Sequence, residues 1–191
     1  MDHTPQVLLL PGWQNSGPAH WQSRWEARYG YPRVEQHDWM QPLRGDWISR
    51  LEDVLLAQSG PSVLVAHSLG CLLVAAWASV SRNTHLVTGA LLVAPGDAER
   101  PELRAPLHSW SPVVMQRLPF VSVLVGSHND PYCSLERAQS FASAWGAQWH
   151  DLGNAGHINA DSGLGDWPHG HALLQTIIHS TPHEGAQHPR S

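Results

Sequence analysis

Residues 63–76 read Val-Leu-Val-Ala-His-Ser-Leu-Gly-Cys-Leu-Leu-Val-Ala-Ala, and this stretch decides the fold. A short apolar run leads into a tight turn at 66–70, and a longer run of good helix formers follows. This is the strand–turn–helix setting in which a small-x-Ser-x-Gly turn lifts a serine hydroxyl above a sheet. The turn is so sharp that the residues two before and two after the serine must be small. Ala66, in place of the commoner glycine, and Gly70 satisfy this, so Ser68 is the candidate nucleophile.

The composition describes one globular domain. The chain has 191 residues, of which 42% are hydrophobic and 14% charged, with a net charge of −5. It contains no lysine and no cluster of arginines, so we expect no nucleic-acid partner. The longest apolar run, Cys71–Ala78, is far shorter than a membrane span, so we expect no membrane partner. We predict a domain at 1–180 and a flexible polar tail at 181–191.

The N-terminus and the cysteines indicate a cellular location. No basic segment precedes the short apolar run at 7–10, so the sequence predicts no secretory signal. Cys71 falls in a helix that we expect to be buried, and we interpret both Cys71 and Cys133 as thiols. The prediction that follows is a cytoplasmic protein.

Short apolar runs alternate with helical patterns along the chain. Strands are expected at 7–10, 33–36, 63–66, 86–93, 121–125 and 148–152, and helices after Ser16-Gly17-Pro18, from Asp46, at 68–81, after Ser134 and at 171–179. This alternation predicts an α/β fold, with a mostly parallel sheet of about six strands and helices on both faces. In such sheets the ligand lies at the carboxyl ends of the strands. We therefore expect the segments 11–16, 67–69, 127–131 and 154–159 to converge there.

Three residues have the chain order of a Ser-Asp-His hydrolase. Ser68 is followed by Asp130, just after a predicted strand, and by His157, in a loop after the last one. A serine becomes nucleophilic when a histidine takes its proton and an acid orients that histidine. His67 is the alternative base, but its side chain should diverge from Ser68 at a sharp turn. Asp97 is the alternative acid, although a Gly-Asp pair is also ordinary turn chemistry.

The remaining polar candidates serve the oxyanion or the substrate. The N–H groups of Leu69 and Trp13 are the expected oxyanion donors. Gly12, Trp13 and His67 are the expected substrate-binding residues, while most of the ten tryptophans should pack in the core. His128 is either a pocket residue or a solvated one, and Asp151 and Asp161 are interpreted as structural or solvated.

The C-terminal histidines do not indicate a metal site. No zinc-ligand spacing relates His169, His171, His179, His183 and His188. We therefore predict no metal and no other cofactor.

Taken together, these segments resemble the retinoblastoma-binding protein 9 / YdeN family of small serine hydrolases, within the α/β-hydrolase superfamily. The matching segments are 11–16, 20–26, 66–70, 127–132 and 156–159. The resemblance implies a compact, lidless α/β-hydrolase with Ser68 as nucleophile, Asp130 as acid and His157 as base. It also implies carboxylesterase-like activity on small esters. A Leu-x-Cys-x-Glu partner motif linked to the human member is incomplete here, because residues 69–73 lack the glutamate.

Two hypotheses follow. The first is a serine hydrolase acting on small carboxylic esters, with an amidase or thioesterase using the same triad as a variant. The second is a non-catalytic binding protein on a hydrolase scaffold. The sequence does not indicate the oligomeric state.

Overall fold

Five parallel strands form one sheet in the order β1-β2-β3-β4-β5, so spatial neighbours are also neighbours in sequence. The computed structural model describes residues 4–180, and the predicted tail at 181–191 lies outside them. The strands are β1 Gln6–Leu10, β2 Ser62–His67, β3 Val87–Val93, β4 Val121–Gly126 and β5 Gln148–Asp151. The helices are α1 Trp21–Tyr29, α2 Arg44–Leu56, α3 Leu69–Val80, α4 Pro101–Arg104, α5 Leu135–Trp145 and α6 Pro168–Ser180.

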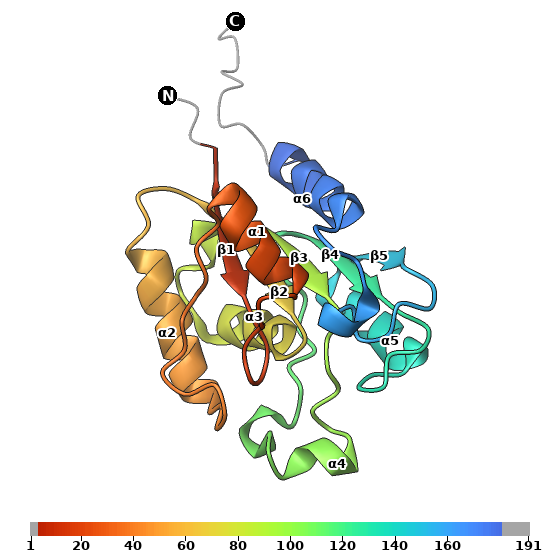
Figure 1. Cartoon of the computed structure of the whole chain (residues 1–191). Coiled ribbons are helices and arrows are strands. Elements are labelled where there is room, and N and C mark those ends of the chain that lie inside the picture. The colour runs from red at the N-terminus through yellow and green to blue at the C-terminus, as the bar shows by residue number, and fades with distance from the viewer. Residues whose placement is uncertain (1–3, 181–191) are drawn as a thin grey trace, which may run out of the picture.

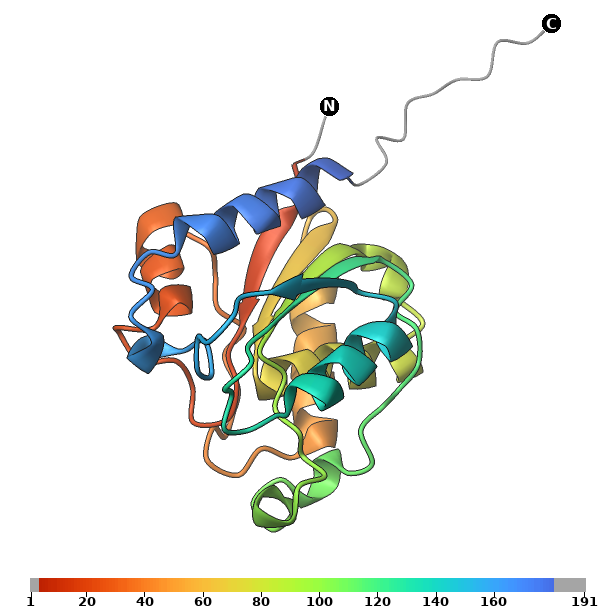
Figure 2. The ribbon, with the colours of Figure 1, turned by 90° about the vertical axis from the view of Figure 1, so that its right-hand side faces the viewer.

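Helices cover both faces of the sheet, as the alternating pattern predicts. In Figure 1, α1 and α6 lie in front of the sheet, and α2, α3 and α5 lie behind it. Figure 2 shows the two layers on opposite sides, with α4 beyond the lower edge. Every residue of β2 is buried, because this strand is covered by helices on both sides. The strands point toward the α4 edge, so the loops that follow them meet there.

One predicted strand is not part of the sheet. Residues 33–36 contribute only an isolated bridge between Arg33 and Leu9, so the sheet has five strands where about six were expected. The segment is mostly polar and offers Val34 as its one buried aliphatic side chain. It lacks the continuous apolar run that a strand buried on both faces needs.

Several helix boundaries differ from the prediction. The cap of α1 is His20, whose Nδ1 accepts from the Gln22 N–H, and not Ser16. Asp46 lies inside the first turn of α2, which begins after Leu43. Ser134, by contrast, caps α5 as predicted, since its hydroxyl accepts from the Arg137 N–H. The predicted loop at 94–106 contains the short helix α4, and α6 begins at 168, before the expected 171.

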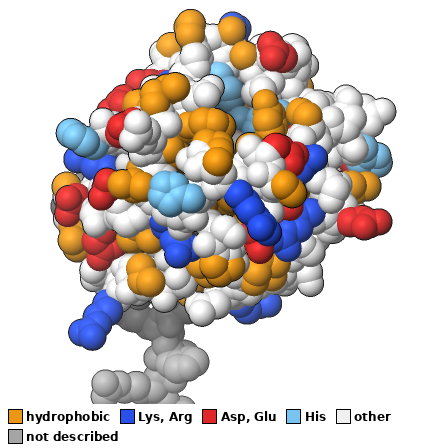
Figure 3. Space-filling view, turned by 90° about the horizontal axis from the view of Figure 1, so that it is seen from below, with side chains coloured by type: hydrophobic (Ala, Val, Ile, Leu, Met, Phe, Trp, Pro, Cys, Tyr) orange, Lys and Arg blue, Asp and Glu red, His pale blue; other side chains and the backbone are white. Residues whose placement is uncertain are grey.

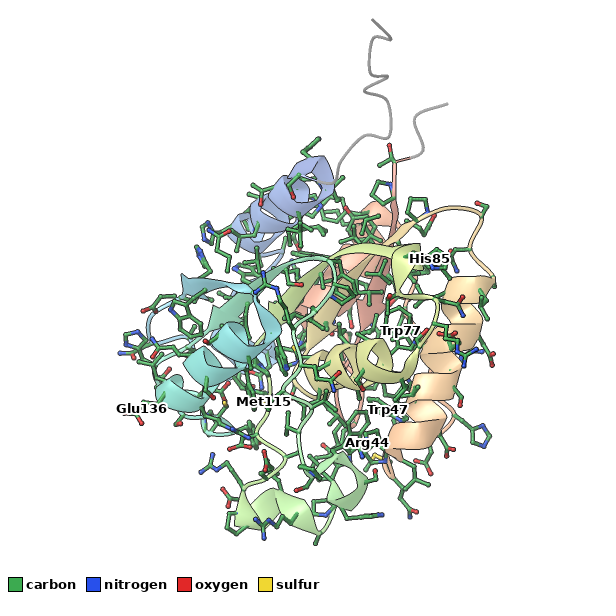
Figure 4. The ribbon with its side chains drawn as sticks, turned by 180° about the vertical axis from the view of Figure 1, so that it is seen from behind. Arg44, Trp47, Trp77, His85, Met115 and Glu136 are labelled. Carbon is green, nitrogen blue, oxygen red and sulfur yellow. The ribbon has the colours of Figure 1, made fainter. Side chains whose placement is uncertain are left out.

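Tryptophans supply the largest fully buried side chains of the core, so the packing interpretation of most of these residues is confirmed. Six are fully buried: Trp21, Trp25, Trp47, Trp77, Trp110 and Trp145. Each of the six donates its indole N–H to an oxygen. Figure 4 shows the layer of α2, α3 and α5 with Trp47 and Trp77 labelled. These side chains combine a large apolar area with satisfied polar atoms, which the cores on both sides of the sheet require.

Both cysteines are free thiols, as predicted, and both are buried. Burial raises the pKa of the Cys71 thiol strongly and that of Cys133 to about 12, so both stay protonated at neutral pH. Among residues 4–180, no helix is long and apolar enough to span a bilayer.

Replacing Gly70 by alanine should destabilise the fold. Gly70 is in the first turn of α3, where an added Cβ would overlap the carbonyl oxygen of Leu10 on β1. We expect a loss of about 1–3 kcal/mol in the free energy of unfolding, measured by urea titration. Gly45 in α2 is the matched control, since an added Cβ there meets nothing within 4 Å. Gly45→Ala should stabilise by about 0.5–1 kcal/mol, and equal effects of the two variants would contradict this account.

Candidate active site

Ser68 occupies a strained turn between β2 and α3. Its backbone has φ 55° and ψ −119°, a conformation that non-glycine residues rarely adopt. The turn is tied down by the Ser68 N–H, which donates to the carbonyl of Val93 over 3.0 Å. The strain places the side chain at the carboxyl edge of the sheet, where it lines a cleft.

The structure brings Ser68, His157 and Asp130 into one hydrogen-bonded chain. Nε2 of His157 lies 2.9 Å from the Ser68 Oγ, and its Nδ1 lies 3.0 Å from both carboxylate oxygens of Asp130. An ionised carboxylate only accepts, so Nδ1 carries the proton and Nε2 is left to accept from the serine hydroxyl. The side chains of His157 and Asp130 are 9% and 4% exposed, so water competes little for these bonds.

The alternative acid, Asp97, interacts with residues of the surrounding segments and not with His157. Its carboxylate accepts from the Glu99 N–H and lies 3.5 Å from the Arg137 guanidinium. Asp130 follows β4, and its carboxylate also accepts from the Tyr132 N–H, which fixes its orientation. The structure therefore pairs His157 with Asp130 and not with Asp97.

The loop that carries His157 is held from several sides. Gly156 and Ile158 both have positive φ, at 60° and 50°, so the loop needs contacts to maintain its shape. The Trp21 indole donates to the Ile158 carbonyl over 2.8 Å, and the His67 ring donates to the His157 carbonyl over 2.9 Å. No local sequence pattern indicates these roles of Trp21 and His67, because the partners are more than eighty residues away.

Two backbone N–H groups beside Ser68 have no partner. Within residues 4–180, no group accepts from the N–H of Leu69, the first residue of α3, or from that of Trp13. A Cβ added at Gly12 would lie 3.0 Å from the Ser68 Cβ and 3.2 Å from the Leu69 nitrogen. The turn after β1 can approach Ser68 this closely because residue 12 is a glycine.

These groups line one cleft of about 350 Å³. Trp13, Leu103, Leu107 and Tyr132 supply apolar and aromatic walls, and the leucines come from α4 and the residues that follow it. No Asp, Glu, Lys or Arg side chain is among the described residues that line the cleft. Figure 3 views the molecule from this edge, and a pale blue histidine surface lies recessed between orange hydrophobic side chains near the upper centre.

His67 and His20 form a buried edge-to-face pair of histidine rings beside His157. The His67 ring lies 4.6 Å from that of His20 and 4.8 Å from that of His157, centroid to centroid. Burial, reinforced by the neighbouring histidines, holds the pKa of His67 well below its usual value. Burial likewise lowers the pKa of His20 to about 3. His67 lines the cleft, but its Nε2 is already bonded to the His157 carbonyl.

The other histidines considered in the sequence lie away from the cleft. His128 pairs with Asp151 on β5, and His150 faces His169 with 2.9 Å between their Nε2 atoms. His171 bonds to the Tyr31 hydroxyl. No set of three potential metal ligands gathers within residues 4–180, and the predictions for His183 and His188 lie outside them.

The buried histidines should make stability depend on pH. A histidine whose pKa is lower in the folded state destabilises the fold as pH falls below the ordinary value of about 6.5. His20 and His67 should each contribute a slope that rises toward about 1.4 kcal/mol per pH unit as the pH falls from 6.5 to 5, above the carboxylate range. Urea titrations of the wild type and His20→Asn, which keeps a capping oxygen, should show a shallower slope for the variant. Identical slopes would contradict the prediction.

The comparisons with known proteins agree with this geometry. Residues 7–176 match the serine hydrolase family. A YdeN-like hydrolase from Pectobacterium atrosepticum is 31% identical, with a TM-score of 0.83 and coverage of 94% of both chains. The ydeN gene product of Bacillus subtilis is 19% identical, with a TM-score of 0.73 over 93% of this chain and 100% of that one.

A more distant structure has the same fold. The carboxylesterase CesB from B. subtilis is 14% identical, with a TM-score of 0.63 and coverage of 93% of this chain and 85% of that one. None of the curated proteins compared with the chain matches it.

The sheet, its two helical layers and the placement of Ser68 define an α/β-hydrolase. The chain belongs to the serine hydrolase family, and its fold is that of the YdeN-like hydrolases.

Proposed function

We propose that the protein is a serine esterase that hydrolyses small, uncharged carboxylic esters through an acyl-enzyme. Ser68 Oγ attacks the ester carbonyl carbon while His157 Nε2 takes its proton, and Asp130 orients and stabilises the imidazolium. The N–H groups of Leu69 and Trp13 donate to the oxyanion. His157 then protonates the departing alcohol, and water attacks the acyl-enzyme by the same route in reverse.

The observation that carries this proposal is the unbroken line of contacts from Asp130 through His157 to Ser68. The 2.9 Å separation of Nε2 and Oγ is already within range for proton transfer, without any rearrangement. The two unpartnered N–H groups beside Ser68 supply the electrostatic half of the mechanism. Among the described residues that line the cleft there is no arginine to pair with a buried carboxylate or phosphate, which favours neutral substrates.

A fluorophosphonate probe tests the proposal against a non-catalytic role. Only an activated serine reacts with such a probe, so the wild type should be labelled at Ser68 and should hydrolyse chromogenic acetyl and butyryl esters. Absence of both labelling and turnover would favour a binding protein on a hydrolase scaffold. Labelling without ester turnover would favour the amidase or thioesterase variant.

We also propose that the protein is cytoplasmic, where its two thiols would stay reduced.

Short acyl chains should be preferred. The cleft volume of about 350 Å³ is near the lower end of the range for ligand sites, about 300–1,000 Å³. Each methylene adds about 0.8 kcal/mol only where it is buried, so chains that extend beyond Leu103 and Leu107 should gain little. We expect kcat/KM to be highest from about acetyl to hexanoyl, with no activation above the micelle threshold. A rate that climbs steadily to palmitoyl would contradict this.

A further inference from the structure

The turn that presents the Trp13 N–H is strained. Gln14 and Asn15 have φ of 68° and 65°, although neither is a glycine. The turn closes through the Asn15 N–H, which donates to the Gly12 carbonyl over 3.1 Å. A non-glycine residue in the left-handed region is strained and persists only when its surroundings enforce it. Some other part of the molecule must therefore hold this turn in shape.

Arg33 donates two side-chain hydrogen bonds to the turn. Its Nη1 donates to the Asn15 Oδ1 over 2.6 Å and to the Ser16 carbonyl over 2.9 Å. The same Asn15 oxygen accepts from the Ser16 N–H, so the guanidinium fixes the side chain that shapes the turn. The Arg33 side chain is only 9% exposed, so water replaces these bonds poorly.

Arg33 is itself held at both ends. The backbone around Arg33 is fixed against β1, where the Leu9 N–H donates to the Pro32 carbonyl and the Val34 N–H donates to the Leu9 carbonyl. Its guanidinium is anchored on α1, with 2.7 Å to the Ser23 Oγ and 2.8 Å to the Glu26 carboxylate. The guanidinium thus joins the turn to two regular elements of the fold.

We propose that Arg33 is a positioning residue for catalysis: its guanidinium holds the strained turn 12–16 so that the Trp13 N–H faces the oxyanion. The inference rests on the proposed esterase function. Arg33 does not line the cleft, so it can act on the substrate only through its neighbours, and among these the turn carries the Trp13 N–H. The opposite side of the turn is held by the Gln14 N–H, bonded to Trp39, and by the Trp13 indole, bonded to Met40. Losing Arg33 should therefore loosen one side of the turn without releasing it.

Arg33→Lys tests the proposal, because lysine keeps the charge but cannot contact Asn15, Ser23 and Glu26 together. A missing oxyanion donor costs about 10²–10³ in kcat, so a displaced one should cost about 10–100-fold, with KM within about threefold of the wild type. The inhibition constant of a trifluoromethyl ketone, which forms a tetrahedral oxyanion on the serine, should weaken by the same factor. Arg50→Lys is the matched control, since Arg50 is exposed and bonds only to the Glu35 carbonyl among the described residues.

Asn15→Gly is a second variant that does not depend on the folding of Arg33→Lys. Glycine accepts the positive φ without strain but removes the oxygen that Arg33 holds. Asn15→Gly should lower kcat in the same way. Combining it with Arg33→Lys should cost little more, because the two variants break the same contact between Arg33 and Asn15.

The outcomes separate this proposal from the proposed function. A fall in kcat and in ketone affinity at constant KM, with Arg50→Lys unchanged, supports Arg33 as the positioning residue. An unchanged kcat, a rise in KM alone, or fully additive effects of the two variants would overturn it. If Arg33→Lys does not fold, Asn15→Gly alone decides by the same readouts. If the wild type neither turns over esters nor reacts with the fluorophosphonate, it is the esterase function that fails.

Discussion

Ser68→Ala is expected to abolish ester hydrolysis and fluorophosphonate labelling while the protein stays folded. The substitution removes one oxygen that faces the cleft, and alanine tolerates the backbone of residue 68 no worse than serine does. His157→Ala should cost about as much, because the members of a triad act as a unit. The expected losses in kcat are on the order of 10⁴–10⁶. Initial rates with p-nitrophenyl acetate, together with circular dichroism for folding, measure both quantities.

The comparison between the two variants is itself informative. Removing Ser68 after His157 should add little, since the serine is not activated without its base. Near-normal turnover by Ser68→Ala would rule out the proposed mechanism. A large additional loss in the double variant would show that His157 and Ser68 act independently.

Asp130→Asn should lower kcat by about 10⁴-fold, the second largest effect that we expect. The asparagine amide would donate to Nδ1 of His157, so the ring would adopt the tautomer that cannot accept the serine proton. The substitution preserves shape, so the free energy of unfolding should change far less than the rate.

Asp97→Asn is the matched control for this prediction. Both aspartates follow strands at the same edge of the sheet, but Asp97 bonds to the Glu99 N–H and lies near Arg137. Its replacement should alter the rate less than about tenfold. The reverse ranking of the two variants would assign the acid to the loop after β3.

The main residues of the candidate site could be predicted from a local sequence pattern and from the topology of a parallel sheet. The strand–turn–helix pattern around Ser68 is local, so the sequence was enough to place it. Parallel strands bring the loops after them to one edge, which is why Asp130 and His157 could be expected beside Ser68. The choice between Asp97 and Asp130 depended on which side chain faces the histidine, and no local pattern carries that information.

The supporting residues were not predictable in the same way. The helical spacing of Trp21 predicts a core residue, yet its indole also donates a hydrogen bond to the Ile158 carbonyl across the molecule. The pattern at 33–36 predicts a strand, whereas the backbone of Arg33 makes a single bridge to Leu9 and its side chain contacts the turn at 12–16. Such roles arise from contacts between distant segments, and hydrophobic periodicity does not encode them.

The sequence by itself determined the α/β class, the alternation of layers and the position of Ser68 in the turn between a strand and a helix, because these follow from periodicity and turn chemistry. The tertiary structure alone decided the number of strands, the pairing of His157 with Asp130, and the two N–H groups left free beside Ser68. The physical reason is distance along the chain. A strand or a helix is specified by residues a few positions apart, while a hydrogen bond between residues 130 and 157 exists only once the sheet has brought their loops together.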